Sequence, residues 1–290
     1  NDGRLVFDRG VFADTLTFGG KIDGTGSLVI ASGAVTLTAN NSYAGATMIA
    51  AGATLNLGHG GTTGWVAGNI ANAGSLTFNR SNDFANAGVI SGNGAISQIG
   101  SGRTILTGDS SGFSGTTDVM AGALVVNGKL GGAVSVGDNG RLGGSGTVGS
   151  LLVSGAVAPG NSIGTLHVAG DITFGANSIY EVEVNPQGQS DQIIAGGKAT
   201  INGGTVKVLA GAGNYAPQTQ YTILTADLAS GGVNGTFNGV TSNLAFLDPS
   251  LSYDPDHVYL TMTRNNMNFA GVGITPNQIA TGGGVESLGF

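Results

Sequence analysis

The sequence predicts an all-β solenoid, a fold in which short strands wind in successive coils that stack on one another. Three observations predict it: 55 of the 290 residues are glycine, the chain contains an internal repeat, and short alternating apolar runs recur about every 20 residues. This glycine content is well above the ~7% of ordinary proteins, and glycine costs about 1 kcal/mol relative to alanine inside a helix. The chain is also 40% hydrophobic and only 9% charged, which is unlike a disordered protein.

The bulk composition excludes several other classes of protein. Ten Lys and Arg residues and a net charge of −7 provide no basic patch for nucleic acid. Six prolines without a strict Gly-X-Y period exclude collagen. The absence of cysteine leaves no disulfide framework or thiolate site, and no apolar run reaches the ~18 residues of a membrane helix. Because Asn1-Asp2-Gly3 lead directly into a strand pattern without a signal peptide, we expect the chain to be part of a longer protein.

The internal repeat is about 70 residues long and aligns residues 1–58 with residues 72–128. The matching motifs are Asn1-x-Gly3-x-Leu5-x-Phe7 with Asn72-x-Gly74-x-Leu76-x-Phe78, Tyr43-Ala-Gly45-Ala-Thr47 with Phe113-Ser-Gly115-Thr-Thr117, and Ala51-Gly52-Ala53 with Ala121-Gly122-Ala123. A register that survives between the copies indicates strands of fixed length joined by turns that tolerate insertions.

A shorter period lies inside the repeat. A small residue followed by glycine precedes strand-like runs at Gly33, Gly52, Gly74, Gly102 and Gly122. Each run alternates apolar and polar residues, which is typical of a half-buried strand. A period near 20 residues predicts one solenoid coil per run, with glycines supplying positive φ angles at the corners.

The pattern changes after about residue 125. Longer strands with larger side chains are predicted at 179–184, 205–209, 221–224 and 257–262, and turn signals such as Asn185-Pro186 separate them. We expect this region to cap the solenoid, because an open end would expose unpaired strand edges. After residue 264 the β pattern fades.

A helix is predicted to begin near Thr275, with Thr275 as its N-cap and Pro276 at its first position. Gly282-Gly283-Gly284 should weaken this helix soon afterwards.

These residues resemble the passenger of a Gram-negative autotransporter of the type V secretion system. The repeats at 24–53 and 92–123 look like passenger-associated transport repeats. Motifs from about residue 124 to residue 264, such as Val157-Ala-Pro-Gly-Asn-Ser-Ile-Gly-Thr-Leu166, are similar to the pertactin-like autochaperone or junction region. The resemblance implies a right-handed parallel β-helix that folds from its C-terminal end, and a C-terminal β-barrel translocator that lies outside this chain.

Three regions follow from this resemblance: β-helix coils with two repeats over 1–123, an autochaperone cap over 124–264, and a linker toward the translocator over 265–290. We expect the folding nucleus to lie in the cap, because large aromatic side chains each bury ~150–250 Å². The expected nucleus consists of Tyr180, Val182, Val184, Tyr221, Ile223, Leu244, Phe246, Val258 and Tyr259. Trp65, the only tryptophan, is a candidate binding anchor, and packing at a wide corner is its ordinary alternative.

No catalytic, cofactor-binding or metal-binding residues are expected. His59, His167 and His257 lie in three separate sequence contexts, and the glycine-rich run 143–149 has no following lysine for a phosphate. No serine lies in a Gly-x-Ser-x-Gly elbow before a helix, and the acidic residues are sparse. Asn265-Asn266 resembles the cleavage site of some serine-protease autotransporters, although these residues precede the expected linker helix.

The predicted function is architectural: the segment nucleates vectorial folding and surface display during outer-membrane secretion, as the stalk of an adhesin. The alternatives are a β-helix face that itself binds host matrix, glycans or other cells, and a polysaccharide-cleaving β-helix enzyme. The expected partners are the chain's own translocator and host surface molecules, without nucleic acid, and the expected state is a monomer. The expected location is the surface of a Gram-negative bacterium, reached through the periplasm, with release into the medium as an alternative.

Overall fold

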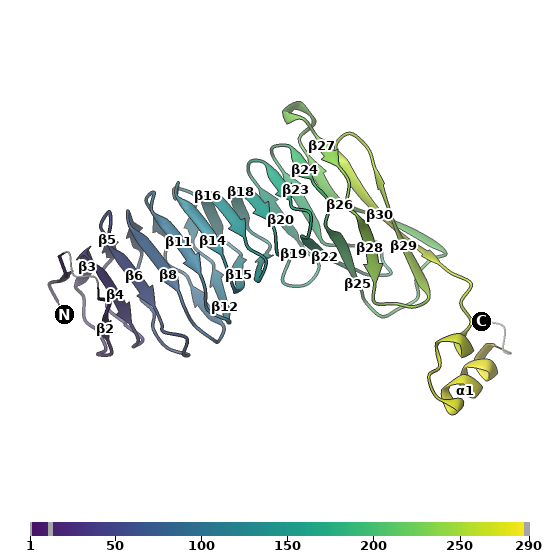
Figure 1. Cartoon of the computed structure of the whole chain (residues 1–290), viewed down its shortest axis with the longest axis horizontal. Coiled ribbons are helices and arrows are strands. Elements are labelled where there is room, and N and C mark those ends of the chain that lie inside the picture. Colours follow the sequence, from purple (N-terminus) through teal and green to yellow (C-terminus); the bar gives the residue numbers. More distant parts are fainter. Residues whose placement is uncertain (1, 11–13, 287–290) are drawn as a thin grey trace.

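The computed structural model describes residues 2–10 and 14–286 and shows an elongated stack of strands (Figure 1). The amino-terminal strands lie at one end of the stack, and a short helix lies beyond the other end (Figure 1). The strands of the described residues form three sheets, and most of their pairings are parallel. The fold is therefore an all-β parallel solenoid, as the sequence predicts.

The three sheets take their strands from successive coils. The first sheet contains β1 (Arg4–Asp8), β3 (Ser27–Ser32), β5 (Thr47–Ile49), β7 (Ile70–Asn72) and β10 (Ile90–Ser91). The third sheet contains β9 (Phe84–Asn86), β12 (Arg103–Leu106), β15 (Gly122–Val126), β17 (Gly140–Gly144), β19 (Ala156–Pro159), β22 (Ile179–Val184), β25 (Thr205–Ala210) and β28 (Gly239–Ser242).

The second sheet is the longest. It contains β2 (Leu16–Phe18), β4 (Ala34–Leu37), β6 (Thr54–Leu57), β8 (Ser75–Phe78), β11 (Ala95–Gln98), β13 (Asp109–Ser110), β14 (Thr116–Val119), β16 (Lys129–Val136), β18 (Thr147–Val153), β20 (Thr165–Val168), β21 (Ile172–Phe174), β23 (Gln192–Ala195), β24 (Ala199–Ile201), β26 (Gln218–Ala226), β27 (Val233–Gly235), β29 (Leu247–Tyr253) and β30 (His257–Arg264). The first sheet ends at β10. From β13 on, the strands in the position of the first sheet belong to the second sheet, because β16 pairs with both β13 and β14.

One continuous core fills the interior of the stack. Along each strand, alternate side chains point inward, as at Val35 and Leu37 of β4, which are fully buried. Parallel pairing aligns each inward residue with its counterpart in the next coil, so Leu37, Leu57 and Phe78 lie in one column. The alternation predicted for these strands is thus confirmed, and it explains how short strands build a long core.

The strand-like runs that recur about every 20 residues belong to two different sheets. Gly33, Gly52 and Gly74 precede β4, β6 and β8 of the second sheet, whereas Gly102 and Gly122 accompany β12 and β15 of the third sheet. The strand that stacks on β8 is β11, not β12. The irregular step from Gly74 to Gly102 therefore contains one coil plus the passage to the next sheet.

The longer repeat is displaced in the same way. β3 and β4 of the first copy correspond to β11 and β12 of the second copy, so strands of the first and second sheets correspond to strands of the second and third sheets. Each copy therefore spans three coils plus the segment that leads from one sheet to the next. The same sequence motif can occupy different faces because every face requires the same alternation of inward and outward residues.

Many glycines are required by close stacking rather than by positive φ angles. In one corner of the stack, a Cβ added at any of these glycines would lie 2.1–2.8 Å from the carbonyl oxygen of the glycine one coil earlier. This glycine ladder consists of Gly45, Gly68, Gly88, Gly108, Gly128 and Gly146. None of its members has a positive φ, unlike Gly33 and Gly122, which have φ values of 70° and 60°. The expectation of positive φ at the corners is therefore correct for only part of the glycines.

The parallel arrangement ends near the C-terminus. The third sheet continues without a break from β12 through β15 and β17, across the predicted boundary at residue 124. The change comes at β26, which pairs in parallel with β23 on one edge and antiparallel with β30 on the other. β29 then pairs antiparallel with β30, so a hairpin covers the edge that the last coil would otherwise expose.

The segment beyond the hairpin contains the predicted helix. It comprises η2 (Phe269–Val272) and α1 (Pro276–Glu286), whereas η1 (Leu228–Ser230) lies before the hairpin, between β26 and β27. The backbone N–H of Gln278 donates to Thr275 Oγ1, and Gln278 Oε1 accepts from the backbone N–H of Thr275, which is a capping box. The helix continues through the three glycines that were expected to weaken it. None of the helices in the described part of the chain has the length and apolar character needed to span a membrane.

Candidate functional site: the C-terminal cap

The region from β21 to β30, residues 172–264, is named the C-terminal cap here. Six of the nine residues expected in the folding nucleus lie in its core. Tyr180, Val182, Ile223 and Val258 have no exposed surface, and Val184 and Tyr221 are 1% and 2% exposed. They come from β22, β26 and β30, so the core joins the last parallel coils to the antiparallel hairpin.

The hydroxyl groups of the buried tyrosines connect separate coils. Tyr180 donates to the carbonyl oxygen of Ile223, and Tyr221 Oη donates to the carbonyl oxygen of Asn185 at 2.7 Å. Burial raises the pKa of Tyr221 to about 12, so the hydroxyl stays protonated and keeps donating at neutral pH. The two bonds join β22 and the turn after it to β26.

Three further residues of this core were not expected from the sequence. Tyr215 Oη donates to the carbonyl oxygens of Gly211 at 2.9 Å and Val184 at 3.2 Å. Phe174 and Phe237 pack edge to face with ring centroids 5.0 Å apart, and both lie within 6.2 Å of the Tyr180 ring. Phe174 could have been found by its alternation with Ile172, whereas Phe237 lies in a glycine- and asparagine-rich turn without such a signal.

Three expected nucleus residues are placed differently. Leu244 and Phe246 are only half-buried, in the connection that leads into β29. Tyr259 lies on the outer side of β30, because its fully buried neighbours Val258 and Leu260 occupy the inward positions. The expected core position of Tyr259 is therefore wrong, and the alternation of a strand gives the physical reason.

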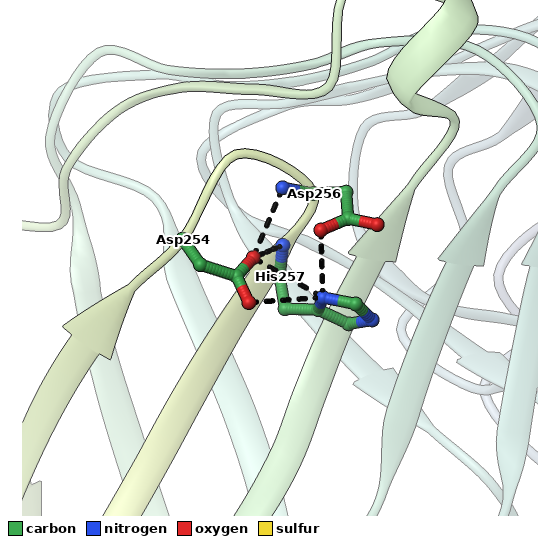
Figure 2. A group of neighbouring side chains, drawn as sticks. All are labelled: Asp254, Asp256 and His257. Carbon is green, nitrogen blue, oxygen red and sulfur yellow. Dashed lines mark hydrogen bonds and ion pairs between the residues drawn. The ribbon is translucent and has the colours of Figure 1, made fainter.

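The tight turn between β29 and β30 holds the outward side chains of this hairpin. Figure 2 shows the imidazole of His257 between the carboxylates of Asp254 and Asp256, with Nδ1 3.1 Å from Asp254 Oδ1 and 2.9 Å from Asp256 Oδ1. Asp254 Oδ1 also accepts from the backbone N–H groups of Asp256 and His257. Tyr259 Oη donates to Asp254 Oδ2 at 2.8 Å, which holds the pKa of Asp254 well below its usual value.

This turn is the one group of three potential metal ligands among the described residues. Its ligand atoms already bond to one another and to the turn backbone, so the three side chains cross-link the hairpin turn. His59 and His167 are exposed and lie in other parts of the stack.

Trp65 is half-buried at the wide corner predicted for it. Its ring lies 5.9 Å from that of Phe84, centroid to centroid, and the Arg80 guanidinium lies 4.8 Å above the Phe84 ring. Arg80 is only 6% exposed and donates to Asn82 Oδ1 and to the carbonyl oxygen of Thr62. These contacts favour packing over exposure as a binding anchor.

The fold and cap define a class: a stack of parallel β-coils whose C-terminal edge is closed by an antiparallel hairpin. Residues 23–57 and 96–126 match the passenger-associated-transport-repeat. An extracellular serine protease of Serratia marcescens is 38% identical over 210 residues, which is 69% of this chain and 20% of the protease. The adhesin BmaC autotransporter of Brucella suis is 37% identical over 144 residues, or 42% of this chain and 4% of the adhesin.

The chain belongs to the autotransporter passengers, and it is an extracellular or cell-surface segment of a Gram-negative protein. A second extracellular serine protease of Serratia marcescens is 31% identical over 211 residues. The chain spans about a fifth of the length of these proteases. Because the match covers a passenger segment, protease activity does not follow from it.

Proposed function

We propose that the C-terminal cap nucleates folding of this passenger and that the upstream coils then add to it one after another as the chain leaves the outer membrane. The fold would then be a right-handed parallel β-helix ended by an autochaperone. The chain acts as a monomer, its direct partner is its own translocator, and the displayed stack serves as the stalk of an adhesin.

The cap has what a nucleus needs. It combines a core of aromatic residues with tyrosine hydrogen bonds between coils, and its hairpin strands β29 and β30 form contacts close in sequence, which carry a small loop-closure cost. The single observation that carries the proposal is that β26 presents a parallel edge to β23 while β30 covers its other edge. Coils can therefore be added in only one direction.

The proposal is tested by removing the cap. A fragment of residues 1–123 is expected to remain without cooperative β structure after dilution from denaturant, whereas the 290-residue chain refolds. Far-ultraviolet circular dichroism during refolding provides the measurement. Cooperative refolding of the fragment alone, with its full β signal, would refute the proposal.

A second candidate function is that the stack itself adheres to host matrix or other cells. It is favoured by the relative named an adhesin, and by the outward Thr, Ser and Asn side chains of the second sheet, such as Asn56, Thr77 and Ser97 in one column. Direct binding of the folded chain to immobilised matrix proteins or to cells tests it, and equal binding to uncoated surfaces would exclude it.

A further inference from the structure

A polar groove with a volume of about 210 Å³ lies on the outer surface of the third sheet. The hollow exists because the outward positions Gly143 on β17 and Ala158 on β19 carry little or no side chain and lie side by side. Val125 and Leu209 line it at either side along the stack. The lining comes from strands β12 to β25, so the groove follows the long axis of the solenoid and spans several coils ~4.8 Å apart.

Ion pairs hold the walls of the groove in place. Arg141 donates from Nε and Nη2 to Glu181 Oε2 at 3.0 and 2.8 Å, and Lys207 Nζ lies 3.1 Å from Glu181 Oε1. Burial works to raise the pKa of Glu181, but the bonds from Arg141 and Lys207 hold it below its usual value. Arg103, at the other end, donates to Asp83 Oδ2 at 2.6 Å. The charged groups are thus oriented before any ligand arrives.

A buried carboxyl group fixes the corner of the groove. Asp191 is 2% exposed, and its two oxygens accept from the backbone N–H groups of Gly164 and Glu183, each at 2.8 Å. Its burial, together with the nearby Glu183 carboxylate, raises the pKa of Asp191 to about 7. The Glu183 carboxylate itself also lines the groove, and it forms no hydrogen bond or ion pair within the described parts of the chain.

The charges of the groove nearly cancel. Arg103, Arg141 and Lys207 oppose Asp83, Glu181 and Glu183, and Asp191, with its pKa raised to about 7, adds part of one negative charge near neutral pH. An anionic ligand would meet the Glu183 carboxylate, and a cationic ligand would meet the guanidinium groups. Planar carboxylate and guanidinium groups, by contrast, can accept from and donate to neighbouring hydroxyl groups of a neutral ligand.

We propose that this groove binds a segment of a neutral polysaccharide, with the Glu183 carboxylate accepting from its hydroxyl groups and the Arg141 guanidinium donating to them. A chain-like ligand fits because the groove crosses several coils along the stack. None of its described lining residues is aromatic, so binding relies on hydrogen bonds and is weak. The inference goes beyond the nucleation function and does not depend on it.

The test uses the folded 290-residue chain, titrated by NMR with cellohexaose, maltohexaose and chitohexaose. At least one of the three is expected to bind with a millimolar or tighter Kd. Glu183→Ala should weaken that binding about tenfold or more, because it removes a hydrogen bond to a charged acceptor. Glu183→Gln should bind within about threefold of the wild type, because the amide oxygen still accepts from a neutral hydroxyl.

A pair of Ala→Leu variants separates filling of the groove from general perturbation. Ala158→Leu is expected to abolish binding because it fills the floor, whereas Ala133→Leu, at an exposed outward position of the second sheet, should bind normally. If Ala158→Leu does not fold, the two Glu183 variants decide.

Three results would overturn the inference. They are no binding of any of the three sugars at about 10 mM, a loss of binding in Ala133→Leu equal to that in Ala158→Leu, or binding of polygalacturonate in place of the neutral sugars. Refolding kinetics of the same variants are expected to match the wild type. A failure of the groove can therefore be told apart from a failure of the nucleation proposal.

Discussion

Buried tyrosines have different roles in the amino-terminal coils, residues 27–126, and in the C-terminal cap. In the coils, Tyr43 bonds to Thr47 Oγ1 at 2.5 Å, four residues away in the same coil. In the cap, the hydroxyls of Tyr180 and Tyr221 reach carbonyl groups 43 and 36 residues away. The coils are thus held mainly by stacking with the next coil, whereas the cap also holds itself together across coils.

The backbone shows the same difference. Strands of the coils pair only in parallel with the coil before and after, so an isolated coil has no partner. In the cap, β30 pairs antiparallel with both β26 and β29. We infer that the cap can form before the coils and that the coils cannot form before the cap.

The largest expected effect comes from matched truncations of fully buried tyrosines. Tyr180→Ala and Tyr43→Ala should each lower the free energy of unfolding by about 3–5 kcal/mol, the cost of a large buried aromatic. If the cap is the nucleus, Tyr180→Ala should mainly slow refolding, whereas Tyr43→Ala should mainly speed unfolding. Stopped-flow chevron plots measure both rates, and the reverse pattern would break the comparison.

A smaller effect is expected at the glycine ladder of the coils. In Gly88→Ala, the new Cβ would lie 2.4 Å from the carbonyl oxygen of Gly68, so we expect a loss of about 1–3 kcal/mol from overpacking. Gly112→Ala is the control, because a Cβ there meets nothing within 4 Å and the φ is not positive. Equilibrium denaturation by urea gives both values, and equal stability of the two variants would show that stacking is looser than described.

The cap should also respond to pH through Asp191. Its folded pKa is raised from 3.8 to about 7, so its favourable contribution is complete below the unfolded pKa and is lost as pH rises through about 7. From pH 6 to pH 8 the wild type should lose about 1 kcal/mol more stability than Asp191→Asn, which does not titrate. Urea titrations of both proteins at the two pH values test this, and parallel pH profiles would contradict it.

The smallest expected effect separates the two kinds of tyrosine hydrogen bond. Tyr221→Phe removes the bond to Asn185 and should cost about 0.5–1 kcal/mol, with part of that cost seen as slower refolding. Tyr43→Phe removes a bond within one coil and should leave the refolding rate unchanged. A slower refolding of Tyr43→Phe would show that its coil also belongs to the nucleus.

The positions of the strands could be predicted from the sequence, whereas their assignment to sheets could not. Alternation such as Val35 and Leu37 marks an inward face wherever it occurs, and it looks the same on all three sheets. For that reason the sequence places the motifs at Gly74 and Gly102 in one series, although they lie on different sheets.

Within the cap, the alternating strands again provided most of what could be predicted. Tyr180, Val182 and Val184 lie in the core as expected, whereas the expected core position of Tyr259 is wrong because Tyr259 alternates with the inward Val258 and Leu260. Phe237 and Asp191 lie in or beside turns, where no period indicates burial. The groove depends on side chains from six coils, and only the stacking register brings them together.

The central claim, that the cap folds first, is tested most directly by pulsed hydrogen exchange during refolding of the 290-residue chain. The account predicts that backbone amides of β22, β26 and β30 become protected first, and that those of β3 to β8 follow in order from the cap toward the amino terminus. Protection of β3 to β8 before the cap, or simultaneous protection of both regions, would contradict it.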